Sequence, residues 1–178
     1  MSSTSEELQK GLEQWKTWAS SADRESDGWE THYPGFDLLM QIAFSVMQTM
    51  PPEDPATVKG VDLCWAISEE DEFLVDCFRD HKPSSTSCEM LWLERLADSQ
   101  DSRTRWQVAS ALGGLEWTDK VLYLLEKLSN DSHDYVRRRA LLELIDSSRN
   151  PNEYLRKLQN DADPYNREVG SKLACENE

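Results

Sequence analysis

An internal repeat of about 30 residues does most to limit what this chain can fold into. Three segments align without gaps, at offsets of 32 and 30 residues: WLERLADSQDSRTR from Trp92, LLEKLSNDSHDYVR from Leu124 and YLRKLQNDADPYNR from Tyr154. Two leucine positions recur in every copy, as Leu93, Leu96, Leu125, Leu128, Leu155 and Leu158. A unit of this length holds two helices, and each helix has an apolar stripe that it cannot bury alone. The repeat therefore predicts helix pairs that stack on one another.

The second helix of each unit is expected after a polar turn. In the third copy Asp163 precedes Pro164, which is the order of cap and first-turn residue favoured at a helix start. Gly113 and Gly114 predict a helix end in the first copy. The apolar residues expected to face the core from the second helices are Val108, Leu112, Ala140, Leu144, Val169 and Leu173.

The sequence of the second copy, NDSHDYVRRRALLELI, resembles the HEAT-repeat family in its short, HEAT-like form. Asp131, Val136, Arg137 and Ala140 match the family's pattern of an aspartate followed by Val-Arg-x-x-Ala. The resemblance covers residues 87–176. It implies an α-solenoid that binds other proteins, although a fold of this kind does not by itself define a function.

The other two copies depart from this pattern. The first has Ser99 and Thr104 where the pattern has aspartate and valine, and the third has Asn166 and Gly170 where it has valine and alanine. The third copy keeps the aspartate and the arginine. The second copy is therefore the clearest of the three.

The N-terminal part of the chain, residues 1–86, is predicted to form further helices without a visible repeat phase. Thr4 and Glu7 form a capping box that predicts a helix over 4–20, and the apolar run 36–50 predicts a helix buried on most sides. Between them lies a polar segment with two glycines and a proline, which reads as a long loop.

These patterns together predict the fold class. No window alternates apolar and polar residues as a strand would, so we expect no sheet. We expect one all-α domain over residues 1–178, a right-handed α-solenoid of about ten helices. Its N-terminal helices, 1–86, are acidic, and the last three helix pairs, in 87–178, are HEAT-like.

The chain is strongly acidic, with a formal net charge of -15. Residues 1–90 hold 6 basic and 18 acidic side chains, whereas residues 91–178 hold 13 and 16. Because phosphate binding needs clustered Lys and Arg, this balance argues against a general binder of nucleic acid or of anionic membranes. It favours a basic partner, or solubility alone.

The cysteines and the N-terminus indicate the cellular compartment in which the protein is expected. The four cysteines fit no zinc module, and Cys64 and Cys77 lie in apolar helical runs, as buried thiols in a reducing environment do. No segment approaches the ~20 apolar residues of a membrane span, and the N-terminus lacks a secretory pattern. We expect a cytoplasmic protein that is a monomer when free.

A column of arginines, Arg105, Arg137 and Arg167, recurs with the repeat. Asp131 precedes Arg137 by six residues, and Asp161 precedes Arg167 by the same spacing. One hypothesis is a row that binds a ligand. The other is a structural ladder, in which each aspartate caps turn amides while it pairs with its own arginine. We favour the ladder, because a residue that repeats usually serves the packing that repeats.

Trp106 and the run Arg137 to Arg139 provide candidate partner-binding residues. Trp106 aligns with Arg138 and Glu168, which predicts a solvent-facing position on a second helix and hence an anchor for a protein partner. The alternative is that the unit of residues 69–81 covers the ring. Arg138 and Arg139 are expected on the same surface, where with Trp106 they would form one aromatic and basic stripe, or else a solvated face.

An acidic cluster lies at a predicted helix start. Ser68 is expected to open a helix whose first turn contains Glu69, Glu70, Asp71 and Glu72, where negative charge complements the helix dipole. Clustered carboxylates raise the local negative potential and would attract a basic partner. The sequence does not show whether this cluster and Trp106 share one surface.

Catalysis finds little support in the sequence. The three histidines are scattered, and there is no H-E-x-x-H motif, G-x-S-x-G motif or Gly-rich phosphate loop. Asp23, Glu25 and Asp27 alternate before Gly28, as in a calcium-binding loop, but Pro34 stands where that loop needs a bidentate glutamate. We expect no cofactor, no metal site and no enzymatic activity.

Three functions remain open. The first is a non-enzymatic protein-binding module, in its sharpest form a small acidic inhibitor or immunity protein that neutralises a basic toxin or nuclease. The second is a HEAT-like adaptor or assembly factor whose partner need not be basic. The third is a lyase-like enzyme of HEAT-like architecture, as the phycobilin lyases are.

Overall fold

The computed structural model of the chain describes residues 3–21, 32–69, 72–147 and 150–176. Within these ranges the chain is all-α, with ten helices and no strand. The helices are α1 Thr4–Ser21, α2 Phe36–Thr49, α3 Pro55–Ile67, α4 Phe73–His81, α5 Cys88–Leu96, α6 Ser102–Gly113, α7 Asp119–Leu128, α8 Asp134–Ser147, α9 Pro151–Gln159 and α10 Pro164–Glu176. The predicted loop with Asp23, Glu25, Asp27 and Gly28 lies largely in the range 22–31, outside the described residues.

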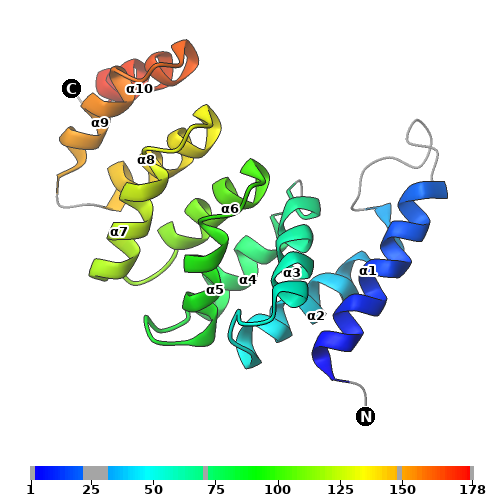
Figure 1. Cartoon of the computed structure of the whole chain (residues 1–178). Helices are drawn as coiled ribbons and strands as arrows, with labels where there is room; N and C mark the ends of the chain where they lie inside the picture. The colour runs from blue at the N-terminus through cyan, green and yellow to red at the C-terminus, as the bar shows by residue number, and fades with distance from the viewer. Residues whose placement is uncertain (1–2, 22–31, 70–71, 148–149, 177–178) are drawn as a thin grey trace.

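The helices follow one another through space in chain order, from α1 at one end to α10 at the other (Figure 1). From α5 onwards they form three pairs, α5–α6, α7–α8 and α9–α10, which are the three copies of the repeat. Each second helix packs against the next unit, since α6 contacts α8, and α8 contacts α9. The chain is therefore an extended array in which most contacts join neighbouring units.

Polar side chains define where several helices begin. Asp54 accepts the N–H of Thr57 at 2.7 Å ahead of Pro55, as the sequence predicts for α3. The first helix differs in detail from its prediction. The cap is Ser3, which exchanges hydrogen bonds with Glu6, so the capping box lies one residue before Thr4 and Glu7.

The predicted apolar positions of the repeat form much of the core. Leu93, Leu96, Leu125, Leu128 and Leu158 are all buried, and so are the first four predicted second-helix residues, Val108, Leu112, Ala140 and Leu144. Trp92 is fully buried, and its indole N–H donates to the backbone oxygen of Met50 at 2.6 Å. Packing of the aromatic ring and this hydrogen bond hold α5 against the C-terminal end of α2.

The last pair has a different outer surface. Leu141, a buried residue of α8, aligns with Ser171 of α10, which is exposed. On the same helix Glu168 and Lys172 form an exposed ion pair. The face of α10 that corresponds to the buried face of α8 is therefore polar and exposed. Gly170 lets α10 lie against α9, because an added Cβ would come within 2.8 Å of the backbone N of Gln159.

The segment 68–72 is the main departure from the predicted helix boundaries. Ser68 ends α3 instead of opening a helix, and α4 begins only at Phe73. Glu72 precedes α4 with a left-handed backbone, at φ 48°. The described members of the acidic cluster, Glu69 and Glu72, therefore lie between α3 and α4 and not inside the first turn of a helix. Glu70 and Asp71 lie outside the described residues.

Two further features bear on the environment of the chain. In the described ranges, none of the helices has both the length and the apolar character needed to cross a membrane. The four cysteines are free thiols. Cys64 is fully buried, and burial raises the pKa of its thiol.

Candidate functional site

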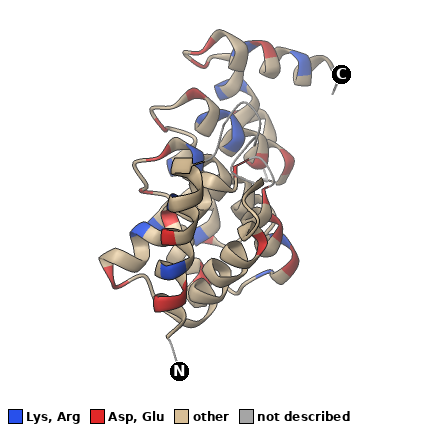
Figure 2. Ribbon diagram, turned by 90° about the vertical axis from the view of Figure 1, so that its right-hand side faces the viewer, with Lys and Arg blue, Asp and Glu red and all other residues tan. Residues whose placement is uncertain are grey.

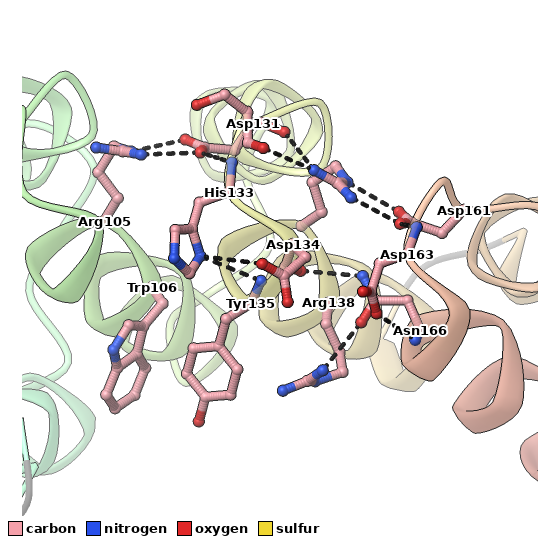
Figure 3. Close-up of polar contacts among 12 residues, drawn as sticks. Arg105, Trp106, Asp131, His133, Asp134, Tyr135, Arg138, Asp161, Asp163 and Asn166 are labelled. Atoms are coloured by element: carbon pink, nitrogen blue, oxygen red, sulfur yellow. Dashed lines mark hydrogen bonds and ion pairs between the residues drawn. The ribbon is translucent and has the colours of Figure 1, made fainter.

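The arginine column forms a ladder of ion pairs, but the pairs join neighbouring units. Arg105 donates to Asp131 of the following unit at 2.7 and 2.9 Å, and Arg137 donates in the same way to Asp161 at 2.9 and 2.7 Å (Figure 3). The expectation that each aspartate pairs with the arginine of its own unit is therefore wrong. Each arginine instead contacts its own turn through backbone oxygens, as Arg137 does with Asp131 at 3.0 Å.

The aspartates of the ladder also cap their turns, as expected. Asp131 accepts the N–H of His133, and Asp161 accepts the N–H of Asp163, both at 2.8 Å. With hydrogen bonds from Arg137 and from that backbone N–H, the pKa of Asp161 falls from 3.8 to about 2. The side chains of Arg137 and Asp161 are only 16% and 5% exposed, so water screens this pair weakly.

The first unit joins its predecessor differently. Asp62 of α3 accepts hydrogen bonds from the hydroxyl groups of Ser99 and Thr104, each at 2.7 Å. These are the two residues that depart from the repeat pattern in the first copy. Here α3 supplies the carboxylate, whereas in the later links the preceding unit supplies a guanidinium. Hydroxyl donors stand where the second unit has aspartate and valine.

Arg167, the third member of the column, stands at the end of the array. Its guanidinium donates to the backbone oxygens of Asp161 and Ala162, each at 2.8 Å, which repeats the contact made by Arg137 with its own turn. No carboxylate of the described chain reaches it. Arg167 therefore shows the arginine of the ladder without its partner from a following unit.

Below the ladder, Trp106, Tyr135 and Arg138 of the second helices lie on one side of the array (Figure 3). Arg139 lies over the Trp106 ring, and Tyr165 of α10 lies against Arg138. We call these residues, together with Glu143, the second-helix surface. Its members are Trp106 of α6, Tyr135, Arg138, Arg139 and Glu143 of α8, and Tyr165 of α10.

Trp106 lies within this surface but is not exposed. It is only 4% exposed, because the ring of Tyr135 packs against it edge-on at 5.2 Å and Arg139 lies 5.4 Å above it. Its indole N–H donates to Glu69 at 3.1 Å. The prediction of a solvent-facing anchor is thus wrong. Of the 69–81 segment named in the alternative, Glu69 binds the indole N–H, while Tyr135 and Arg139 of α8 cover the ring. The alignment with Arg138 could not show that these two residues of the following unit pack against Trp106.

Arg138 is held between two aromatic rings. Its guanidinium carbon lies 4.7 Å from the ring centre of Tyr135 and 4.6 Å from that of Tyr165. It also donates to the side-chain oxygen of Asn166 at 3.0 Å, and Asn166 in turn donates to the backbone oxygen of Asp134. Asn166 replaces the valine of the repeat pattern, and these bonds explain why a buried amide is tolerated there.

The acidic turn and the basic stripe lie on one surface, which the sequence left open. Arg139 reaches Glu72 at 3.6 Å, and it donates to the hydroxyl group of Ser110 at 2.9 Å. Glu69 is engaged by Trp106. Two of the acidic residues chosen as partner contacts therefore bind side chains of this chain and do not stand free. Across the array acidic and basic residues are interspersed (Figure 2).

Sequence reasoning missed Tyr135, Tyr165 and Glu143. The two tyrosines occupy the same position of successive repeats, and that signal was present in the alignment. Glu143 carried no comparable signal, because its importance comes from Gly113 on a neighbouring helix. In the part of the chain that the structure describes, no group of three His, Cys, Asp or Glu side chains is placed to hold a metal ion.

Comparison of the chain with protein-family models, with curated proteins and with solved structures gives no match. The residues and their geometry therefore carry the functional argument.

Proposed function

We propose that this chain is a non-enzymatic protein-binding module that binds its partner through the second-helix surface. In this proposal the array is a right-handed α-solenoid, its last three helix pairs are HEAT-like repeats, and the protein acts in the cytoplasm. The most concrete form is a small acidic inhibitor, such as an immunity protein, whose partner is a basic toxin or nuclease.

The observation that carries the proposal is the arrangement of Arg138 between Tyr135 and Tyr165. Tyrosine and arginine are the residues most enriched at protein interfaces, and Tyr165 is 56% exposed. Both sides of the guanidinium are occupied by rings, so its position is set before any partner arrives. A pre-arranged side chain loses little conformational entropy on binding.

The charge of the chain supports a basic partner. A net charge of -15 accelerates the encounter with a positively charged protein, and salt screens that attraction. Because Glu69 and Glu72 are engaged within the chain, we assign steering to the whole acidic surface rather than to the 69–72 turn alone. A HEAT-like adaptor would use the same surface without this dependence on salt.

The test compares two exposed tyrosines. The partner is first captured by cross-linking in a lysate of the native source and purified. Its affinity is then measured for the wild type, for Tyr165→Ala on the second-helix surface, and for Tyr123→Ala on α7. Tyr123 is 62% exposed and lies on a first helix, so it is a matched control.

We expect Tyr165→Ala to weaken binding about tenfold or more, and Tyr123→Ala to leave it nearly unchanged. Loss of binding in Tyr123→Ala alone would place the interface on the first helices and refute the proposal. Binding that needs the second-helix surface but does not slow between low and high salt would favour the adaptor.

A further inference from the structure

Glu143 occupies an unusual place on the second-helix surface. It follows Arg139 by four residues on α8, so the two side chains share a face of the helix. The Glu143 side chain is folded across Gly113 at the end of α6, and a Cβ atom added to Gly113 would collide with its carboxylate. Even an alanine at position 113 would displace Glu143.

The carboxylate of Glu143 has no donor of its own among the residues that the structure describes. The charged groups that face it are Arg139 and Arg79, with Asp146 and Glu72 as like charges. Both arginines are engaged elsewhere: Arg139 with Ser110 and Glu72, and Arg79 with Glu72 and Asp76. Neither makes a hydrogen bond or a close ion pair with Glu143.

This placement is unfavourable for the folded chain alone. Glu143 is half-buried, and burial raises the pKa of its carboxyl group, which means that the ionised form is stabilised less here than in water. An ionised group that is partly desolvated and lacks a partner lowers stability, and such costs are typical of functional positions.

We propose that Glu143 receives the guanidinium or ammonium group of a partner protein that docks on the second-helix surface. The inference rests on the proposed function and names the chemical group of the partner that this surface would bind. The carboxylate lies on the same helix face as Arg139, one turn away. A cationic side chain of the partner would find there a carboxylate to which no residue in the described ranges donates a hydrogen bond. The positive charge of that partner side chain also complements the net negative charge of the whole chain.

A first consequence concerns stability without any partner. Since the folded state raises the pKa of Glu143, the folded state binds more protons than the unfolded state around that pKa, and stability falls as pH rises through this range. Glu143→Gln removes the ionisable group. It should therefore be more stable than the wild type at pH 7 and should lose this advantage below the ordinary pKa of glutamate.

The binding test uses a nonamer of arginine as the probe, with a nonamer of the uncharged analogue citrulline as its control. Titrations of the full chain at pH 7 and low salt are followed by NMR. The matched protein control is Glu13→Gln, which removes an exposed carboxylate from the middle of α1 and changes net charge equally.

We expect the arginine nonamer to change the NMR chemical shifts of α8 residues around Glu143 and of Gly113. The affinity for the nonamer should be about fivefold lower in Glu143→Gln and nearly unchanged in Glu13→Gln. Equal losses in the two variants would mean that only general attraction is at work and would overturn the inference. So would shifts confined to other helices. Failure of the proposed function is distinguishable, because it appears as unchanged partner binding in Tyr165→Ala.

Discussion

The ladder makes a quantitative prediction, because Arg137 has a carboxylate partner from the next unit, as Arg105 does, whereas Arg167 has none among the described residues. Arg137 binds two carbonyls of its own turn and Asp161 of the next unit, whereas Arg167 binds two carbonyls and no described carboxylate. Arg137→Ala should therefore cost more stability than Arg167→Ala, by the worth of the ion pair between units.

The size of this difference follows from the pKa of Asp161. A fall from 3.8 to about 2 corresponds to about 2 kcal/mol of stabilisation at neutral pH, at about 1.4 kcal/mol per pKa unit. The hydrogen bond from Arg137 is the largest cause of this fall, and the backbone N–H of Asp163 and the Asn166 side chain share in it, so about 2 kcal/mol is the upper bound for the ion pair. For a chain of this length we expect Arg137→Ala to lower the melting temperature by up to about 8 °C more than Arg167→Ala.

The sign of the pH dependence provides a second check. The folded state lowers the pKa of Asp161, so this stabilisation is complete above pH 3.8 and is lost as pH falls towards 2. Urea unfolding followed by circular dichroism should show the gap between the two variants at pH 7 and a narrower gap near pH 3. Equal losses for Arg137→Ala and Arg167→Ala at pH 7 would refute the ladder as a link between units.

Three further predictions concern packing. Trp106→Ala should destabilise the chain by about 3 to 5 kcal/mol in urea unfolding, as loss of a buried ring does, whereas a loss below about 1 kcal/mol would contradict its burial. Gly170→Ala should cost about 1 to 3 kcal/mol because the new methyl group meets the α9 backbone, and Gly11→Ala should cost less because it meets only the movable end of Leu39; the reverse order would contradict the packing of α10. Thr104→Val should cost about 1 to 3 kcal/mol by removing a buried donor to Asp62, and an unchanged melting temperature would argue against that bond.

The repeat predicted the array because its information is local and redundant. Leucine spacing alone identifies which face of each helix is buried, and Leu93, Leu125 and Leu158 are core residues as expected. Proline and aspartate likewise mark the start of α3 correctly. Features that lie within one helix and recur in each copy could be read from the alignment.

Contacts between residues of different units, or between the repeat and the helices before it, could not be read from the alignment. Trp106 aligns with the partly exposed Arg138, yet it is buried, because Tyr135 and Arg139 pack against its ring and Glu69, which lies outside the repeat, accepts its indole N–H. The pairing of Arg137 with Asp161 shows a related difficulty. A spacing of six residues within one unit suggested a local pair, but the side chain extends to the next unit, and spacing along the chain does not report that distance.

The site was predicted in part for the same reasons. Arg138 and Arg139 do lie on a second helix, α8, where Arg139 lies over the ring of Trp106 and Arg138 lies against Tyr135. The ion pair of Arg139 with Glu72 joins α8 to the residue that precedes α4, which is a contact between a helix of the repeat and a segment outside it. No periodic signal encodes such a contact.

The central claim is that a partner binds the second helices and not the first. Hydrogen–deuterium exchange of the chain with and without its purified partner tests this most directly. We expect the partner to slow exchange in peptides that cover residues 135–146 of α8 and 164–168 of α10, while peptides of α7, over 119–128, exchange at the same rate. Protection confined to α7, with α8 and α10 unchanged, would contradict the account.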